Sequence, residues 1–264
     1  MRADVKTGGA LSKWRLFVND QLAIIPGVDL NERESCVEQK LVFEAGKKDL
    51  LLDWLEFHLV RDPEFYFSPV ISLYYDTPGF RLYGEALNGD YLKTKIRLRW
   101  YQATFAPKQD TVQCFVEIKS KFGSQRQKRR KAVALEPTSL SGDLFSDRTL
   151  LSLPDVLPEW RTLVRGILVP VLTVEYERYR FVDPVSGARI ALDGRIGCSR
   201  ANVAYVPGAV PIVLSNGVLE VKGAVESLPE PLRPIQRHLR RRSFSKYSRC
   251  LSLLIDPLRP GGLA

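Results

Sequence analysis

The sequence predicts an α+β protein in which antiparallel strands surround a positively charged lumen. Six segments have the period of a β-strand and carry a charged side chain at every second position. Runs of turn-forming residues separate many of these segments, and helical spacing is confined to a few stretches. Because side chains alternate across a strand, the charges of each segment share one face. The 264 residues suffice for one large barrel domain or for two smaller domains.

The segment that predicts the lumen most directly is KTKIRLRWY, residues 93–101. An ordinary half-buried strand would turn its apolar face to the core and leave its cations in water, so this segment alone leaves both arrangements open. One face carries Lys93, Lys95, Arg97 and Arg99, and the other carries Thr94, Ile96, Leu98 and Trp100.

Five further segments repeat the pattern and favour cations that point inward. Like charges inside a barrel repel one another and are costly to desolvate, so a basic lumen requires an anionic guest. A polyanion is therefore the expected ligand. The charges on these faces are Glu38 and Lys40 in 36–40, Glu117 and Lys119 in 115–119, Arg178 in 174–178, Arg189 and Asp193 in 188–193, and Glu220 and Lys222 in 219–223.

Composition points to anionic partners without choosing among phosphates, nucleic acid and acidic lipid. The chain has 39 Lys and Arg against 30 Asp and Glu, a net charge of +9. Its cysteines form no CxxC pair, which indicates reduced thiols and not a zinc or redox site. The amino terminus lacks a signal-peptide pattern, and the apolar run 166–174 is too short to span a bilayer. We expect a cytoplasmic protein without a transmembrane segment.

The first hundred residues contain an arm, a helix and a broken strand. Residues 1–35 hold two short apolar pieces and are expected to form an N-terminal arm, either docked on the domain or a partly ordered tail. Residues 47–59 have helical spacing, which makes His58 a helix residue and not a ligand. The β-rich run 70–83 is interrupted by the turn-forming residues 76–79.

The second half of the chain alternates between strands and less regular segments. The four cations Lys128 to Lys131 run into an apolar stretch, so half of them would face a lumen and half the solvent. The remaining segments are a loop at 101–112 between antiparallel neighbours, an irregular excursion at 136–158, a helix near 159–168 and two short helices at 229–254.

The chemistry-bearing residues suit phosphoryl transfer. The chain has two histidines and lacks the GxSxG, HExxH, Walker-type and GxGxxG motifs. Cations with a few carboxylates are the set needed to position and neutralise a moving phosphoryl group. Glu38, Glu117 and Glu220 are the candidate ligands for Mg²⁺ or Mn²⁺, which prefer oxygen donors shared with substrate phosphates. Each of them could instead be a salt-bridge partner of neighbouring cations.

An ordered series of motifs resembles the VTC domain, the polyphosphate polymerase branch of the triphosphate tunnel metalloenzymes, also called the CYTH-like superfamily. The resemblance implies an antiparallel, eight-stranded β-barrel tunnel with helices packed on the outside, occupying residues 36–264. The matching pieces are VEQK (37–40), LYYDTPGFRLY (73–83), KIRLRWY (95–101), FVEIK (115–119), KRRK (128–131), VEYERYRF (174–181), ARIALD (188–193), LEVKG (219–223) and SFSKYSR (243–249).

The resemblance also implies the residues of the site. Glu220 matches the metal-binding carboxylate of the family, and Arg129 or Lys131 is favoured as the lumen cation within KRRK. Lys95 and Lys222 lie on the same charged faces and complete the predicted set. The residues expected to line the tunnel and hold phosphates are Lys40, Arg97, Arg99, Lys119, Arg178, Arg189 and Lys246, with Ser245 beside them.

The implied reaction moves the γ-phosphate of ATP onto a growing polyphosphate chain, aided by Mn²⁺ or a similar ion. An attacking phosphate oxygen is already ionised, so the scarcity of histidine fits this reaction. Two alternatives remain: a triphosphate hydrolase of the same superfamily, and a non-catalytic binder of polyphosphate or nucleic acid that uses the basic segment 233–249. Hydrolases of the superfamily typically carry ExExK, and Cys36 stands here in place of its first glutamate. We expect no specific nucleic-acid partner.

Overall fold

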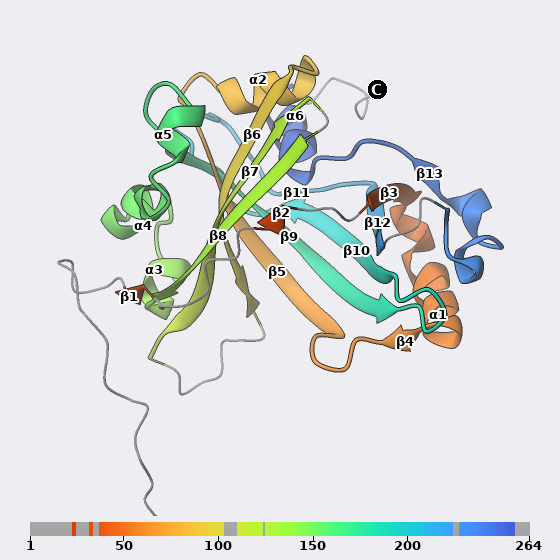
Figure 1. Ribbon diagram of the computed structural model, residues 1–264. Helices are drawn as coiled ribbons and strands as arrows, with labels where there is room; N and C mark the ends of the chain where they lie inside the picture. The colour runs from red at the N-terminus through yellow and green to blue at the C-terminus, as the bar shows by residue number, and fades with distance from the viewer. Residues whose placement is uncertain are drawn as a thin grey trace, which may run out of the picture.

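The computed structural model describes residues 23–24, 32–33, 37–102, 110–123, 125–223 and 227–256, which form one curved antiparallel sheet with helices on both of its faces (Figure 1). Eight strands in this part of the chain have eight or more residues. They are β3 (Val37–Glu44), β5 (Phe67–Asp76), β6 (Leu92–Tyr101), β7 (Val112–Phe122), β8 (Gln125–Leu135), β9 (Val169–Val182), β10 (Arg189–Cys198) and β12 (Asn216–Gly223).

Five two-residue strands extend the sheet at its edges. The strands pair in the order β1-β8-β7-β6-β5-β9-β10-β12-β3-β13, with β2 on β8, β4 on β9 and β11 on β10. The five short strands are β1 (Ala23–Ile24), β2 (Glu32–Arg33), β4 (Val60–Arg61), β11 (Ile212–Val213) and β13 (Arg240–Arg241).

The predicted α+β class is confirmed, but a closed eight-stranded barrel is not. In the described part of the chain, no backbone pairing joins β8 to β3. Part of the outer edge of β8 pairs with β1 and β2, and part of the outer edge of β3 pairs with β13. The two edges meet instead through side chains, with Arg126 Nη1 3.5 Å from Glu38 Oε2.

The outer face of the sheet carries the apolar halves of the alternating strands. Ile96, Leu98 and Trp100 of β6 are buried in a core with residues of α3 (Pro137–Ser141), α4 (Arg148–Ser152), η3 (Leu153–Val156) and α5 (Trp160–Leu163). A second outer core joins α1 (Lys48–His58), preceded by η1 (Ala45–Lys47), to β3, β10 and β12. Because the apolar faces of these strands are buried outside, their charged faces line the concave side.

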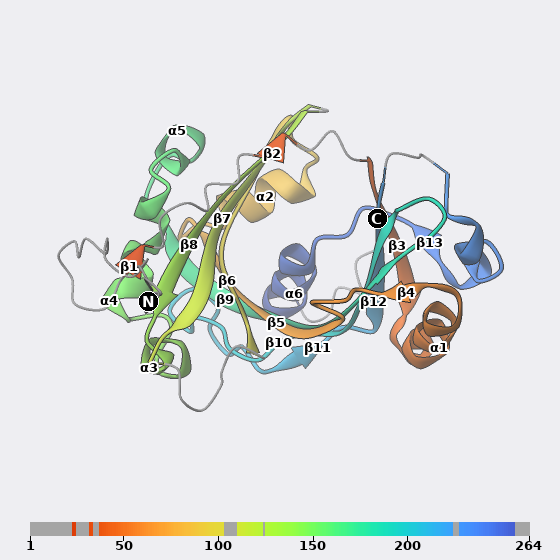
Figure 2. The ribbon, with the colours of Figure 1, turned by 60° about the horizontal axis from the view of Figure 1, so that its bottom comes forward.

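One helix contradicts the prediction that helices pack only on the outside. The sheet curves around α6 (Lys246–Ile255), as Figures 1 and 2 show. Phe244, just before this helix, and Tyr247 within it are buried with Val70, Tyr74 and Val218 of the sheet. This part of the concave face is apolar, and an amphipathic helix removes it from water.

Three segments differ from their sequence-based assignments. Residues 81–87 form helix α2 (Arg81–Leu87) and do not continue a strand, because Asp76 accepts hydrogen bonds from the backbone N–H groups of Leu82 and Tyr83. Short helices replace most of the irregular excursion expected at 136–158. The expected pair of helices at 229–254 is instead η4 (Glu230–Leu232), η5 (Gln236–His238), β13 and α6.

Asp76 ties α2 and α6 to the end of β5. It is fully buried, and it accepts hydrogen bonds from the backbone N–H groups of Thr77, Leu82 and Tyr83 and from the Tyr247 hydroxyl at 2.8 Å. Burial raises the pKa of Asp76, and these donors oppose the rise. Losing one donor would leave a buried carboxylate undersatisfied.

The Tyr247→Phe substitution is expected to lower the free energy of unfolding by about 1–2 kcal/mol, because it removes a buried hydrogen bond while keeping the ring. Urea unfolding measures this value. Tyr91→Phe is the matched control, since Tyr91 is 74% exposed. Equal stabilities of the two variants would show that the Asp76 network does not hold α6.

Candidate active site: a cationic cavity on the concave face

The charged faces of β6, β7 and β8 lie side by side on the concave side of the sheet. In the strand register, Lys95 is opposite Lys119 and Lys119 is opposite Lys128. One step further along the strands, Arg97 is opposite Glu117 and Glu117 is opposite Arg130. The alternation in the sequence therefore places six charged side chains in two adjacent rows.

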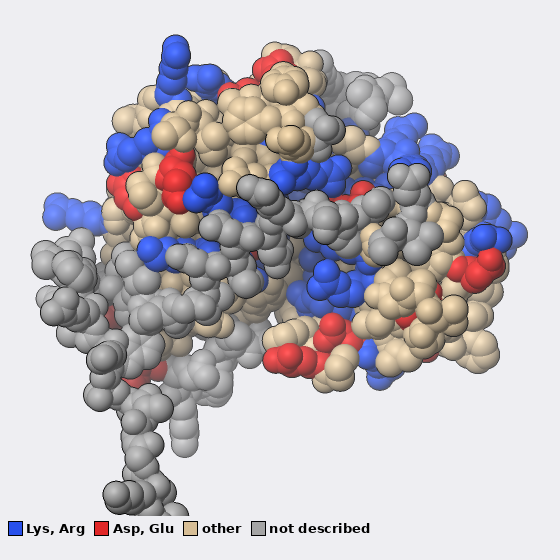
Figure 3. Space-filling model, in the orientation of Figure 1, with Lys and Arg blue, Asp and Glu red and all other residues tan. Residues whose placement is uncertain are grey.

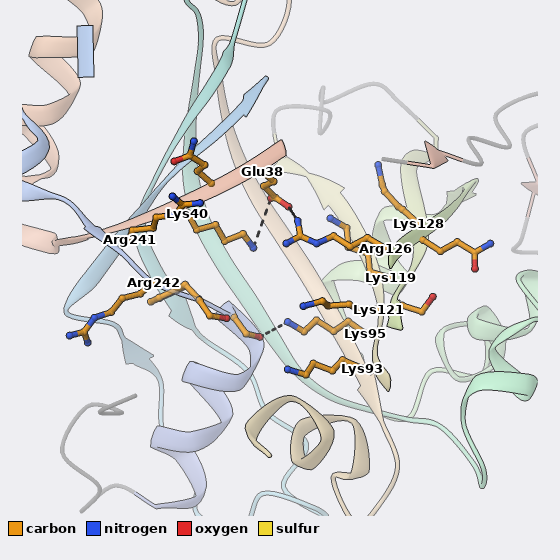
Figure 4. A pocket seen from close by; sticks show the side chains of 16 residues that line it. Glu38, Lys40, Lys93, Lys95, Lys119, Lys121, Arg126, Lys128, Arg241 and Arg242 are labelled. Atoms are coloured by element: carbon orange, nitrogen blue, oxygen red, sulfur yellow. Dashed lines mark hydrogen bonds and ion pairs between the residues drawn. The ribbon is translucent and has the colours of Figure 1, made fainter. Parts of the chain in front are cut away.

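A cavity of about 490 Å³ opens between the first of these rows, Lys95, Lys119 and Lys128, and strand β3 (Figures 3 and 4). Its lining contains one carboxylate, Glu38, against nine cations. A space this basic favours a ligand with several negative charges. The nine cations are Lys40, Lys93, Lys95, Lys119, Lys121, Arg126, Lys128, Arg241 and Arg242.

Lys95 and Lys119 are the most strongly perturbed groups of the cavity. Burial lowers the pKa of Lys95 to about 7, and the neighbouring cations Lys40 and Arg97 add to this effect. Burial, together with Arg97, likewise lowers the pKa of Lys119 to about 7. Lys95 also donates a 2.9 Å hydrogen bond to the hydroxyl of Ser245, the N-cap of α6. An anion bound here would favour the charged form of both lysines.

Glu117 is the counterion of an arginine cluster deeper on the same face. Its carboxylate is 2% exposed and accepts a 2.7 Å hydrogen bond from Arg97 Nε. Arg130 Nε lies 3.5 Å from one of its oxygens, and Arg99 Nη1 lies 4.0 Å from the other. Burial alone would raise the pKa of Glu117, but Arg97 and Arg99 hold it well below its usual range. These contacts favour the salt-bridge interpretation of Glu117 over the metal-ligand interpretation.

A second ion-pair cluster joins three strands to α6. Both oxygens of Asp193 accept hydrogen bonds from Arg178 at 2.6 Å. Glu220 accepts from Arg178 at 2.9 Å and from Lys246 Nζ at 3.3 Å, and Lys246 lies 2.6 Å from Asp193. Lys40 of the cavity is 4.0 Å from Glu220. Burial opposes ionisation of Glu220, yet Lys246 and Arg178 keep its pKa well below the usual range.

The carboxylates do not form a metal site by themselves. In the described part of the chain, no group of three or more His, Cys, Asp or Glu side chains could hold an ion. Glu38 lies 3.9 Å from Lys40 and 3.5 Å from Arg126. Glu220 is likewise held in ion pairs with Arg178 and Lys246, so none of the three candidate carboxylates is without a cationic partner.

The structure brings together most of the residues predicted from the sequence, but not Arg129 and Lys131. These two lie on the outer face, where Arg129 pairs with Glu159 at 2.5 Å and Lys131 donates to the Val156 carbonyl at 3.3 Å. The cations of this segment that point to the concave side are Lys128 and Arg130. The register of β8 with β7 places them opposite Lys119 and Glu117, so the prediction that Arg129 or Lys131 points inward is wrong. Lys128 lines the cavity.

Two further predicted residues, Arg189 on β10 and Lys222 on β12, lie outside the lining of the cavity. They are opposite each other in the register of β10 and β12, and Arg189 is exposed. Lys222 is also opposite Glu38 of β3. Neither lines the cavity, so they are apart from Lys95 and Lys119.

Sequence analysis missed several functional-site candidates that the fold supplies. Asp193, which orients Arg178 and Lys246, was placed on a charged face but given no role. Lys121 follows Lys119 by two positions, so the period of two could have found it. Arg241 and Arg242 carry no such signal, since only the pairing of β13 with β3 brings them to the cavity.

The fold and the cavity define a β-sheet protein with a strongly basic cavity on the concave face of its sheet. The family model described as the VTC domain matches residues 38–255. The chain belongs to the VTC domain family, which confirms the resemblance in the sequence and, with it, a fold of the triphosphate tunnel type.

Solved structures and curated proteins add little to this assignment. A protein from Bacillus halodurans described as "a putative adenylate cyclase" is 15% identical, with 72% of this chain and 81% of that chain covered and a TM-score of 0.43. A protein from Vibrio parahaemolyticus with the same description is 13% identical, with coverages of 78% and 94% and a TM-score of 0.39. Values this low say nothing about the activity of this chain. None of the curated proteins compared with it matches.

The described helices are all too short or too polar to cross a membrane.

The two faces of β8 allow a matched test of the cavity. Lys128→Ala is expected to weaken binding of inorganic tripolyphosphate about ten-fold or more, because it removes a charged hydrogen-bond donor from the lining of the cavity. Arg129→Ala, on the outer face of the same strand, should leave the affinity unchanged. Isothermal titration calorimetry measures both. A loss in Arg129→Ala that equals the loss in Lys128→Ala would contradict the inward orientation.

Proton uptake on binding follows from the lowered pKa values of Lys95 and Lys119. Both lysines are largely neutral above pH 7 in the empty cavity, and a bound polyanion raises their pKa values. Tripolyphosphate binding at pH 8 should therefore take up protons, and its affinity should fall as the pH rises from 7 to 9.

Calorimetry at pH 8 in buffers of different ionisation enthalpy measures this uptake. Lys95→Ala and Lys119→Ala should each reduce it, whereas Lys131→Ala on the outer face should not. Zero uptake by the wild-type protein would mean that these lysines stay charged in the empty cavity.

Proposed function

We propose that the protein is a polyphosphate polymerase that transfers the γ-phosphate of ATP to the end of an inorganic polyphosphate chain. The observation that supports this most is a single cavity lined by nine cations and one carboxylate in a chain of the VTC domain family. The cations of the lining follow one another along β6, β7 and β8, so a linear chain of phosphates can contact several of them at once. Family membership suggests an enzyme, and the phosphotransferase activity belongs to the proposal.

The residues of the cavity would hold and neutralise phosphates. Lys95 and Lys119, on neighbouring strands, face a common space in which two adjacent phosphates can be held. Arg97 and Arg99 supply further donors, and Glu117 fixes their orientation through ion pairs. The chain-terminal phosphate oxygen attacks in its ionised form, so these cations stabilise the charge on the transferring phosphoryl group without a general base.

Arg178 and Lys246 occupy the next part of the concave face. Asp193 orients both of them through contacts of 2.6 Å, which preorganises two cations toward the substrate. A divalent ion, Mn²⁺ or Mg²⁺, would be held by Glu220 together with substrate phosphates and would supply additional charge neutralisation. Cys114, Cys198 and Cys250 are free thiols, which supports a cytoplasmic location.

The direct test incubates the purified protein with ATP and Mn²⁺ and resolves ADP, free phosphate and long polyphosphate. The wild type is expected to form polymer and matching ADP. Lys119→Ala and Glu220→Gln should each lower the rate at least ten-fold, because the first removes a cation at the phosphates and the second removes the proposed ligand of the divalent ion. Arg61→Ala, an exposed residue paired with Glu56, is the control and should retain full activity.

Other products would assign a different activity. Free phosphate without chain growth would indicate a triphosphate hydrolase. No turnover, with tight polyphosphate binding, would indicate a non-catalytic binder. Either result would overturn the polymerase proposal.

A further inference from the structure

The concave face of β6 changes in character along its length. Its inward positions, in order, carry two lysines, two arginines and then an aromatic ring, Tyr101. On β7 the same order runs from Lys121 and Lys119 through Glu117 to Phe115. The two rings therefore lie beyond the arginine cluster, at the end remote from the lysine-rich cavity. Tyr101 is about 27 Å along the strand from Lys93 and about 7 Å from Arg99.

Two arginines accompany the rings at this end. Tyr101 and Phe115 make an edge contact with ring centroids 6.3 Å apart. The Arg130 guanidinium carbon lies 3.5 Å from the centroid of Phe115, and that of Arg180 lies 5.8 Å from the centroid of Tyr101. Tyr101, Phe115 and both arginines are partly exposed, so a ligand could reach them.

The chemistry of this end differs from that of the cavity. Planar guanidinium and aromatic groups provide stacking surfaces for a heterocyclic base, and the strength of such stacking depends little on the base. A lysine ammonium offers charge but no such surface. If the two ends served the same inorganic chain, the rings would contribute nothing to its binding.

We propose that the aromatic end, defined as Tyr101, Phe115, Arg130 and Arg180, is the nucleoside subsite, so that the base and ribose of a nucleoside triphosphate lie there. The triphosphate then lies along Arg99 and Arg97, with its γ-phosphate toward Lys95 and Lys119. The polyphosphate chain occupies the lysine-rich cavity and leaves through it. This orientation rests on the proposed function, since it names how the two substrates share one concave face.

The test compares a ligand that carries a base with one that lacks it. Tyr101→Leu and Phe115→Leu are titrated with adenosine 5′-(β,γ-imido)triphosphate, which prevents turnover, and with inorganic tripolyphosphate. The Kd of the nucleotide is expected to rise about ten-fold, as for the loss of one stacked base, and the Kd of tripolyphosphate should stay within two-fold. Unchanged tripolyphosphate binding also shows that the variant is folded.

Matched controls sit at the opposite end of the same strands. Phe122→Leu, on β7 and 40% exposed, should alter neither affinity. Lys121→Ala should weaken both ligands or neither, but should not weaken the nucleotide selectively. A Tyr101→Leu or Phe115→Leu variant that weakens both ligands equally, or neither, would overturn the subsite.

Failure of the polymerase proposal gives a different result. A protein that releases free phosphate or makes no product, yet shows the selective loss of nucleotide affinity, keeps its nucleoside subsite. A protein that makes polymer but shows no selective loss keeps its function and loses the subsite.

Discussion

The pairing of buried carboxylates with inward-pointing cations is the constraint on which the structure depends. Alternation along β6 buries Ile96, Leu98 and Trp100 on one face, which forces the cations of the other face onto the concave side. Uncompensated, these charges would be costly to desolvate. Glu117, between Arg97 and Arg130, and Glu220, between Arg178 and Lys246, reduce that cost. The lysines of the cavity have fewer acidic neighbours, and this is where an anion gains most.

This division of charge separates structural from binding cations. Arg97 and Arg178 have carboxylates within 3 Å, so their positions are fixed before a ligand arrives. Burial, together with neighbouring cations, lowers the pKa values of Lys95 and Lys119 to about 7. A bound polyanion would supply the negative charge that these two lysines lack in the empty cavity. The fold thus places arginines of fixed orientation beside lysines whose charge depends on the ligand. This arrangement suits a polymer that is held during transfer and then shifts along the cavity.

The faces of the strands could be predicted from the sequence, but their phase and closure could not. The pattern in KTKIRLRWY predicts the inward residues of β6, because the three apolar residues Ile96, Leu98 and Trp100 share the opposite face. In KRRK every position is a cation, so only pairing with β7 shows that Lys128 and Arg130 point inward. Closure of the sheet depends on which strands pair with the edges of β8 and β3. The partner of β3 is β13, which is distant in sequence, so this pairing could not be predicted from local patterns. Helix α6 inside the curve likewise follows from tertiary packing, since an amphipathic helix has no preference for either face.

A crystal structure with bound inorganic tripolyphosphate tests the central claim most directly, because it shows where a polyanion lies without assuming any reaction. We predict phosphates on the concave face, in contact with Lys95, Lys119 and the neighbouring arginines of β6 and β8. Phosphates bound instead to the exposed arginines outside the cavity, such as Arg233 and Arg237, with the concave face free of ligand, would contradict the account.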